Sequence, residues 1–210
     1  MKATQRLHEI GQSIWLDNLT RGLLASGKLR EYIEDLTVTG LTSNPTIFDH
    51  AIRYSQDYDD AIRQKLKEGN SGEELFFELA IGDLRHAADL FRPIYDRTNG
   101  ADAWASLEVS PWLSRHTAGT LVAAKALHGR ANRPNLFVKI PGASAGFLAI
   151  EEAIFAGVPV NMPPPVLRRK IYPGCLGIPA RHRASYLRRT ESICRLSGFA
   201  VRQPLGCNGC

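Results

Sequence analysis

The segment NLFVKIPG, residues 135–142, is the most strand-like stretch of the chain. It is almost continuously apolar, which is typical of a strand covered on both faces in a parallel sheet, and it carries one charged residue, Lys139. Segments with the pattern of a helix lie on both sides of it, at about 117–128 and 146–156. A buried strand between two helices is the building unit of an α/β fold.

The same alternation continues outward from this segment. Further strands are predicted for residues 14–19, 37–45, 104–110 and 158–161. The helical segments between them are predicted at about 23–33, 48–70 and 71–94, the last beginning with the capping-box pair Ser71 and Glu74. Strands that alternate with helices indicate a parallel sheet, and neither GxGxxG nor GxxxxGK[ST] is present to favour a nucleotide-binding fold.

Single polar residues within otherwise apolar strands suit a (β/α) barrel, in which functional side chains stand at the carboxyl ends of the strands. A complete barrel of this type takes about 250 residues and eight strand–helix units. In this chain, four units and the start of a fifth are visible by residue 161. The expected fold class is therefore α/β, an incomplete (β/α)8 TIM-type barrel of roughly four to five strand–helix units with an irregular tail.

Composition and charge divide the chain into two parts. Of its 210 residues, 44% are hydrophobic and 22% are charged, as in a globular protein. Residues 1–161 hold 17 Lys and Arg against 20 Asp and Glu, whereas residues 162–210 hold nine against one, with all four cysteines and six of the twelve prolines. We expect residues 1–161 to form the N-terminal part of the barrel. Residues 162–210 are expected to be a Pro/Arg/Cys-containing tail that is not a folded domain, with the composition of a stretch read in a shifted frame.

Several classes of partner are not expected. No uncharged stretch approaches the ~20 apolar residues that span a bilayer. The first residues, MKATQRLHEIGQS, lack the apolar core of a signal peptide, so a cytoplasmic protein without a membrane partner is expected. Cys207 and Cys210 form the one CxxC pair of the sequence, where a zinc ribbon needs two, and no metal is expected. The arginines of the tail are scattered, so no nucleic-acid partner is expected either.

Four polar side chains stand at strand positions: Asp17, Asn44, Glu108 and Lys139. Each has a structural alternative, since an acid near a strand end can cap the next helix and Asn44 before Pro45 can make a turn. Lys139 is flanked by apolar residues, and burial favours the neutral amine, a nucleophile that forms Schiff bases with carbonyl substrates. The two acids would then transfer protons. The alternative is a lysine on an edge strand whose ammonium group reaches solvent.

Longer motifs around these residues resemble those of bacterial transaldolases, in the class I aldolase superfamily. The matching stretches occur in the family's order over roughly residues 10–161 and include SIWLDNLTRGLL (13–24), LTSNPTIF (41–48) and NLFVKIPG (135–142). The resemblance implies a (β/α)8 barrel and a class I aldol mechanism that uses no cofactor. It also implies sugar phosphate substrates, with a dihydroxyacetone unit passing from a ketose phosphate to an aldose phosphate in the pentose phosphate pathway.

The same resemblance implies roles for particular residues. Lys139 matches the Schiff-base lysine of the fourth strand, and Asp17 matches the first-strand general acid/base of carbon–carbon cleavage. Glu108 matches a third-strand glutamate that acts through a water during dehydration of the carbinolamine. The substrate-binding positions of the family are matched by Asn44, Thr42, Ser106 and Asn161.

The resemblance ends at Asn161. There the family continues with an apolar strand that bears a catalytic threonine, whereas this chain has NMPPPVLRRK, with Pro163 at the threonine position. Consecutive prolines cannot continue a central strand because they lack the N–H group of the ladder. We therefore expect that the C-terminal part of the family is lost or frameshifted and that this chain has little or no turnover. Two alternatives stay open, a non-catalytic half-barrel with a basic, anion-binding tail and a small aldolase of the same superfamily that cleaves without an acceptor sugar.

Overall fold

The computed structural model describes residues 2–142 and 144–162. Residues 163–210, which make up nearly all of the expected tail, lie outside the described residues. The structure therefore bears on the expected barrel part of the chain.

A single five-stranded sheet forms the centre of the described part, and its strands follow one another in sequence order. The strands are β1 Ile14–Leu16, β2 Val38–Thr42, β3 Trp104–Glu108, β4 Leu136–Lys139 and β5 Val160–Asn161. Each strand pairs in parallel with the next. This confirms the predicted α/β class. The strand order never reverses, as it does in a doubly wound fold, and is the order found in a barrel wall.

The sheet is strongly curved, as two contacts between non-neighbouring strands show. The rings of Trp15 on β1 and Phe137 on β4 lie 6.3 Å apart, although three strand spacings on a flat sheet would separate them by about 14 Å. The side chains of Asn161 on β5 and Ser106 on β3 are joined by a hydrogen bond across β4. Within the described residues β1 and β5 each have one partner strand, so the sheet is an incomplete barrel wall with a concave inner face.

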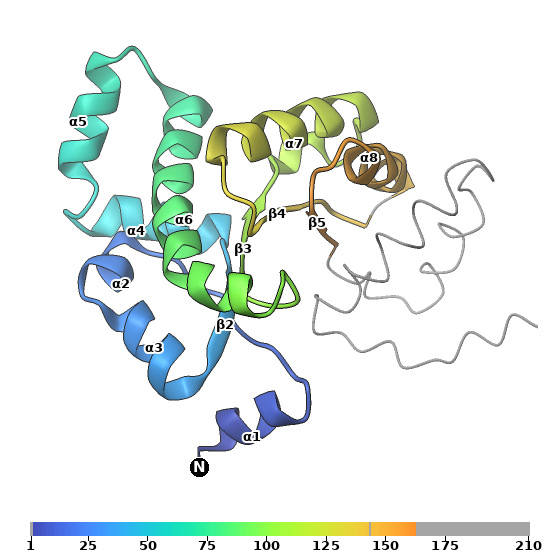
Figure 1. Cartoon of the computed structure of the whole chain (residues 1–210). Coiled ribbons are helices and arrows are strands. Elements are labelled where there is room, and N and C mark those ends of the chain that lie inside the picture. Colours follow the sequence, from blue (N-terminus) through green and yellow to red (C-terminus); the bar gives the residue numbers. More distant parts are fainter. Residues whose placement is uncertain (1, 143, 163–210) are drawn as a thin grey trace, which may run out of the picture.

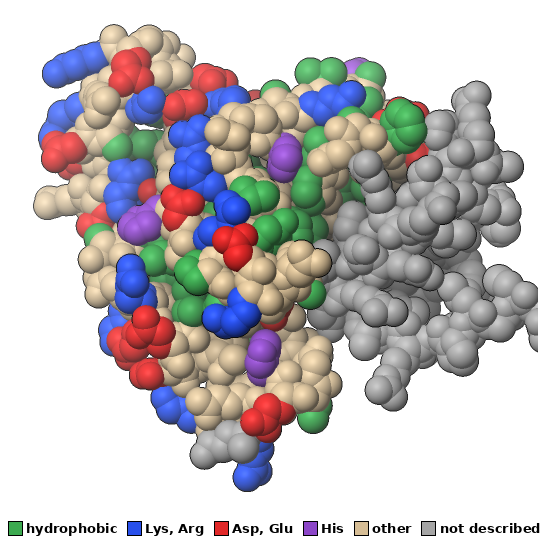
Figure 2. Space-filling view, viewed as in Figure 1, with side chains coloured by type: hydrophobic (Ala, Val, Ile, Leu, Met, Phe, Trp, Pro, Cys, Tyr) green, Lys and Arg blue, Asp and Glu red, His purple; other side chains and the backbone are tan. Residues whose placement is uncertain are grey.

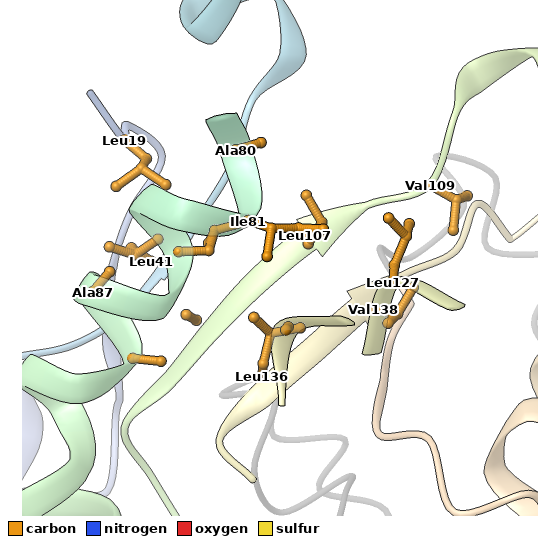
Figure 3. Packing of buried hydrophobic residues seen from close by; sticks show 14 of the residues in the cluster. Leu19, Leu41, Ala80, Ile81, Ala87, Leu107, Val109, Leu127, Leu136 and Val138 are labelled. Atoms are coloured by element: carbon orange, nitrogen blue, oxygen red, sulfur yellow. The ribbon is translucent and has the colours of Figure 1, made fainter. Parts of the chain in front are cut away.

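Most of the helices cover the convex face of this wall, whereas α1 Ala3–Glu9 lies apart from them, next to β1 (Figure 1). The other helices are α2 Arg21–Ala25, α3 Lys28–Leu36, α4 Pro45–Tyr54, α5 Asp59–Lys67, α6 Gly72–Arg97, α7 Thr117–Ala131 and α8 Ser144–Phe155, with a 3₁₀ turn, η1, at Pro111–Leu113. The long helix α6 packs on β3 and β2, and α7 packs on β4. Figure 3 shows Ile81 of α6 lying against Leu107 of β3, and Leu127 of α7 near Val138 of β4. The apolar strand residues that alternate with the inner-face residues therefore form the main core.

The structure corrects several predicted boundaries. The helix expected at about 23–33 is two helices, α2 and α3, because Gly27 between them has a φ of 74° and interrupts the helical path. The helical segment at 48–70 is also two helices, α4 and α5. Ser71 is the N-cap of α6, but its side chain makes no capping hydrogen bond, so the predicted capping box with Glu74 is wrong.

The outward faces of the helices carry charges of both signs, interspersed over the helical layer in Figure 2. Many of these charges pair along or between helices. Lys65 of α5, for example, bridges Glu68 of its own helix and Glu78 of α6. Among the described residues, no helix is long and apolar enough to cross a membrane.

Candidate active site

Lys139 and Glu108 form an ion pair on the concave face of the sheet. They are the last residues of β4 and β3 and stand directly opposite each other in the strand register. The Lys139 Nζ atom donates a hydrogen bond to Glu108 Oε2 over 3.0 Å, and the two side chains are 21% and 22% exposed. Because β4 pairs with both β3 and β5, Lys139 is not on an edge strand, and that alternative is wrong. The parallel register brings the amine and the carboxylate together although 31 residues separate them.

Ser106 and Asn161 form a second contact next to this pair. Asn161 is the register partner of Lys139 on β5, and its Nδ2 atom donates a hydrogen bond to Ser106 Oγ over 3.1 Å. Ser106 is fully buried and lies two residues before Glu108 on the same face of β3. Four of the seven predicted site residues therefore meet on the inner face of three adjacent strands.

The other three predicted residues lie near the same ends of β1 and β2. Thr42 is the register partner of Ser106, and its hydroxyl group donates to the Ser43 carbonyl over 3.3 Å. Asn44 is the N-cap of α4, where its Oδ1 atom accepts from the Thr46 N–H over 3.1 Å, so its side-chain oxygen caps a helix, which differs from the turn that was its alternative. Asp17 follows β1 directly and is exposed. Among the described residues, no hydrogen bond or ion pair joins Asp17 to the other predicted positions.

A layer of aromatic rings lies beneath the polar residues and was not anticipated from the sequence. Trp104 and Phe137 are stacked with ring centroids 3.9 Å apart, and Trp15 stacks on Phe137. Each ring stands two residues before a predicted site residue along the chain, so the rings line the same face one level deeper. Gly40 on β2 makes room for the Trp15 indole, which a Cβ atom at that position would strike. A glycine inside a strand is a known signal of such close approach.

Ser43, like the residues of the aromatic layer, was not predicted from the sequence to belong to the site. Its backbone N–H donates to the Ser106 carbonyl over 2.8 Å, and its Oγ atom accepts from the Glu108 N–H over 3.4 Å. Ser43 therefore continues the β2–β3 ladder at the point where the chain turns away toward Asn44 and α4. This contact helps to hold the Glu108 backbone in position.

The chemistry open to this arrangement is that of an amine beside a carboxylate on a preorganised strand face. A lysine that attacks a carbonyl must lose a proton, and a carboxylate at 3.0 Å is placed to accept it. Within residues 2–142 and 144–162, no three His, Cys, Asp or Glu side chains gather as they would around a metal ion.

Comparison with known proteins gives one consistent result. Residues 14–162 match the sequence model of the family described as transaldolase/fructose-6-phosphate aldolase. The chain is 43% identical over 159 residues to a transaldolase of Arthrobacter sp. (strain FB24), covering 76% of this chain and 43% of that protein. It is 41% identical over 162 residues to a transaldolase of Thiobacillus denitrificans, covering 77% of this chain and 45% of that protein. The chain thus spans less than half the length of these curated relatives.

Proposed function

Because the chain belongs to the transaldolase/fructose-6-phosphate aldolase family, we propose that the inner face of its sheet performs the lysine-imine chemistry of a transaldolase. The observation that carries this proposal is the 3.0 Å contact between Lys139 Nζ and Glu108 Oε2 on the concave face of the barrel wall. By family the chain is a transferase, and its substrates are sugar phosphates. Its place is then in carbohydrate metabolism of the cytoplasm, in the pentose phosphate pathway.

The first stage is formation of the imine. Glu108 accepts a proton from the Lys139 ammonium group, and the free amine attacks C2 of the ketose phosphate to give a carbinolamine. Acting through a water, the same carboxyl group returns the proton to the departing hydroxyl group, which leaves as a water molecule. The resulting iminium carries a positive charge beside the Glu108 carboxylate, which stabilises it.

The second stage breaks and remakes a carbon–carbon bond. Asp17 takes the proton of the C4 hydroxyl group, the C3–C4 bond breaks, and its electron pair moves toward the iminium nitrogen. An aldose phosphate leaves, and a dihydroxyacetone unit stays on Lys139 as an enamine. Attack of this enamine on a second aldose phosphate, followed by hydrolysis, completes the transfer. The overall reaction converts sedoheptulose 7-phosphate and glyceraldehyde 3-phosphate to erythrose 4-phosphate and fructose 6-phosphate.

The remaining inner-face residues are proposed to hold the sugar. Asn161 and Ser106 lie beside the lysine and offer an amide and a hydroxyl group to the substrate hydroxyl groups. The amide nitrogen of Asn44 is proposed for the same role, since its oxygen atom already caps α4. Thr42, opposite Ser106 in the register, completes the set. Because the described residues supply five of the eight strands of a complete barrel, we propose that imine formation is retained while turnover is low.

Borohydride trapping tests the proposal. The purified chain is incubated with fructose 6-phosphate, reduced with borohydride and digested, and the adduct is located by mass spectrometry. We expect a dihydroxyacetone or sugar adduct on Lys139. The adduct should be absent from Lys139→Ala and retained in Lys125→Ala, which removes an exposed lysine on α7. No adduct from a chain shown by circular dichroism to be folded would overturn the proposal.

A turnover assay without borohydride separates transaldolase from the aldolase alternative. With erythrose 4-phosphate present, a transaldolase forms sedoheptulose 7-phosphate from the three-carbon unit bound to Lys139. An aldolase releases free dihydroxyacetone without any acceptor. The remaining alternative, an anion-binding half-barrel, depends on residues 162–210, which lie almost wholly outside the described residues.

A further inference from the structure

Asp17 is the one predicted site residue whose side chain makes no hydrogen bond or ion pair within the described residues, and it is exposed. Lys139 and Glu108, by contrast, hold each other over 3.0 Å, and a hydrogen bond joins Asn161 to Ser106. The position of the Asp17 carboxylate is therefore set by the backbone of the loop that carries it.

This loop, residues 17–20, is a short link between β1 and α2. At its start, Leu16 of β1 pairs with Leu41 of β2 in the sheet. At its end, the Thr20 side chain caps α2 by accepting from the Leu23 N–H over 3.2 Å. The helix α2 has only five residues, and a helix of that length is not stable without tertiary contacts. The path of the loop therefore depends on what holds α2 in place.

The first residue of α2, Arg21, is held by Tyr58 and Asp83, and these three residues are called the Arg21 cluster below. The Arg21 guanidinium donates to Asp83 Oδ1 on α6 through Nε and Nη2, over 3.0 and 2.9 Å. The Arg21 backbone N–H donates to the Tyr58 hydroxyl oxygen over 2.8 Å, and that hydroxyl group donates to Asp83 Oδ2 over 3.0 Å. The cluster thus binds both the side chain and the backbone at the start of α2.

The burial of the Arg21 cluster points to a geometric role. Tyr58 is fully buried, and the Asp83 side chain is 6% exposed. A buried ion pair often contributes no more stability than apolar residues of the same volume, but its hydrogen bonds have fixed directions. The buried side chains of Leu19 and Leu24 already anchor this region in the apolar core. What the polar cluster adds to these contacts is a defined orientation of α2.

We propose that the Arg21 cluster positions Asp17 for cleavage of the carbon–carbon bond. By fixing the first residue of α2, the cluster fixes the loop of residues 17–20, so that the Asp17 carboxylate meets the C4 hydroxyl group of the bound sugar. Asp17 follows Trp15 by two residues, and the Trp15 ring stacks on Phe137 on the concave face, so strand alternation directs Asp17 toward that face. The inference rests on the proposed function for the role of Asp17.

Borohydride trapping tests the inference because it distinguishes the two stages of the reaction. Before cleavage, reduction with fructose 6-phosphate leaves a six-carbon sugar phosphate on Lys139, and after cleavage it leaves a three-carbon unit. Tyr58→Phe removes only the hydroxyl group of the cluster and should lower the ratio of three-carbon to six-carbon adduct about tenfold after a short incubation. The total adduct should stay within about twofold of the wild type, because imine formation does not use Asp17. Tyr54→Phe, which removes an exposed hydroxyl group on α4, is the matched control and should leave the ratio unchanged.

Two further variants separate positioning from a general loss of stability. Arg21→Lys keeps the positive charge but loses the planar pair of donors, and it should lower the ratio of adducts as Tyr58→Phe does. Phe91→Ala weakens the core at another point of α6 and should leave the ratio unchanged. An unchanged ratio in folded Tyr58→Phe, or an equal fall in Phe91→Ala, would overturn the inference.

Amide hydrogen exchange tests the same inference without any substrate. Peptides that cover residues 17–25 should exchange about tenfold faster in Tyr58→Phe than in the wild type, while those of α7 should not change. Equal exchange of residues 17–25 in the two proteins would overturn the inference, even if Lys139 forms an adduct. Absence of any adduct in the wild type would instead overturn the proposed function, and faster exchange would then still support the hold of the cluster on the loop.

Discussion

At the scale of single residues, the partly buried pair of Lys139 and Glu108 dominates the candidate site. Each side chain keeps about a fifth of its surface exposed, so each charge depends on the other for stabilisation. The Asn161 amide and the Ser106 hydroxyl group satisfy each other beside this pair. The inner face thus holds polar groups that are already oriented before any ligand arrives.

A conservative change at Glu108 tests its role in proton transfer. Glu108→Gln keeps the shape of the side chain but removes its ability to accept and return a proton. We expect the rate of borohydride-trapped adduct formation at Lys139 to fall about 100-fold. Mass spectrometry of a time course measures this rate, and Glu152→Gln on the exposed side of α8 is the matched control. An unchanged rate in folded Glu108→Gln would show that another group moves the proton.

At the scale of elements, a buried polar cluster joins the helices α2, α5 and α6. Arg21 on α2 binds Asp83 on α6 through Nε and NH2, at 3.0 and 2.9 Å. The Tyr58 hydroxyl group, just before α5, donates to the other Asp83 oxygen over 3.0 Å and accepts from the Arg21 N–H. Burial raises the pKa of Asp83 above its ordinary value of 3.8, although Arg21 and Tyr58 act in the opposite direction. Burial and the charge of Asp83 also raise the pKa of Tyr58.

The raised pKa of Asp83 gives a testable dependence of stability on pH. Because folding favours the protonated form, the contribution of Asp83 to stability is full below pH 3.8 and falls as the pH rises through the raised pKa. Asp83→Asn carries no charge at any pH, so the free energy of unfolding of the wild type relative to this variant should rise as the pH falls through the raised pKa.

Urea unfolding of the wild type and Asp83→Asn at pH 7 and pH 4 measures how the difference in their free energies of unfolding changes with pH. The wild type should gain stability relative to the variant as the pH falls. Asp60→Asn, whose side chain is 99% exposed, should have little effect at either pH. A loss of wild-type stability relative to the variant between pH 7 and pH 4 would mean that the pKa of Asp83 is lowered in the folded state.

The packing of β1 on β2 depends on the missing side chain of Gly40. Gly40→Ala should destabilise the protein by about 1–3 kcal/mol, because the new methyl group strikes the Trp15 indole. The double variant Gly40→Ala/Trp15→Leu should recover part of that loss, since the smaller side chain leaves room. Gly82→Ala on α6, where a Cβ meets no atom within 4 Å, should be neutral or stabilising. Chemical denaturation of these proteins and of the single variant Trp15→Leu completes the cycle, and strict additivity of the two single changes would contradict the proposed clash.

At the scale of the whole molecule, one face of the sheet contributes to stability and the other carries the candidate site. The convex face and its helices bury the apolar core, and the concave face carries the reactive groups. Phe91 of α6 is fully buried in that core. Stability and chemistry should therefore respond to different substitutions.

Phe91→Ala tests this separation. We expect it to lower the free energy of unfolding by about 3–5 kcal/mol. The adduct rate at Lys139, measured without denaturant and per folded molecule, should stay within about twofold of the wild type. Leu66→Ala on the exposed side of α5 is the control and should change neither quantity much. A large loss of adduct rate in folded Phe91→Ala would show that the helical layer positions the site.

The local sequence pattern was sufficient to predict that strands alternate with helices and that polar residues stand at the ends of the strands. The alternation is visible because neighbouring residues alone set the apolar period, and Asn44–Pro45 ends β2 by its own backbone preference. The boundaries were less certain, and the break at Gly27 between α2 and α3 was missed. A single glycine is compatible with a continuous helix as well as with a break, so only the packed fold settles which occurs.

The contacts within the candidate site could not be predicted in this way, because they join residues that are distant in the sequence. Lys139 and Glu108 are 31 residues apart, and Trp15 and Phe137 are farther apart still, yet the register and curvature of the sheet bring each pair together. The curvature of the sheet cannot be predicted from individual residues, because it arises when all five strands pair in order and the helices pack on one face. The reactive residues could therefore be identified from the sequence, because residue type and the two-residue period of a strand are local properties. Their meeting on one concave face is tertiary, because it depends on the arrangement of the strands in space.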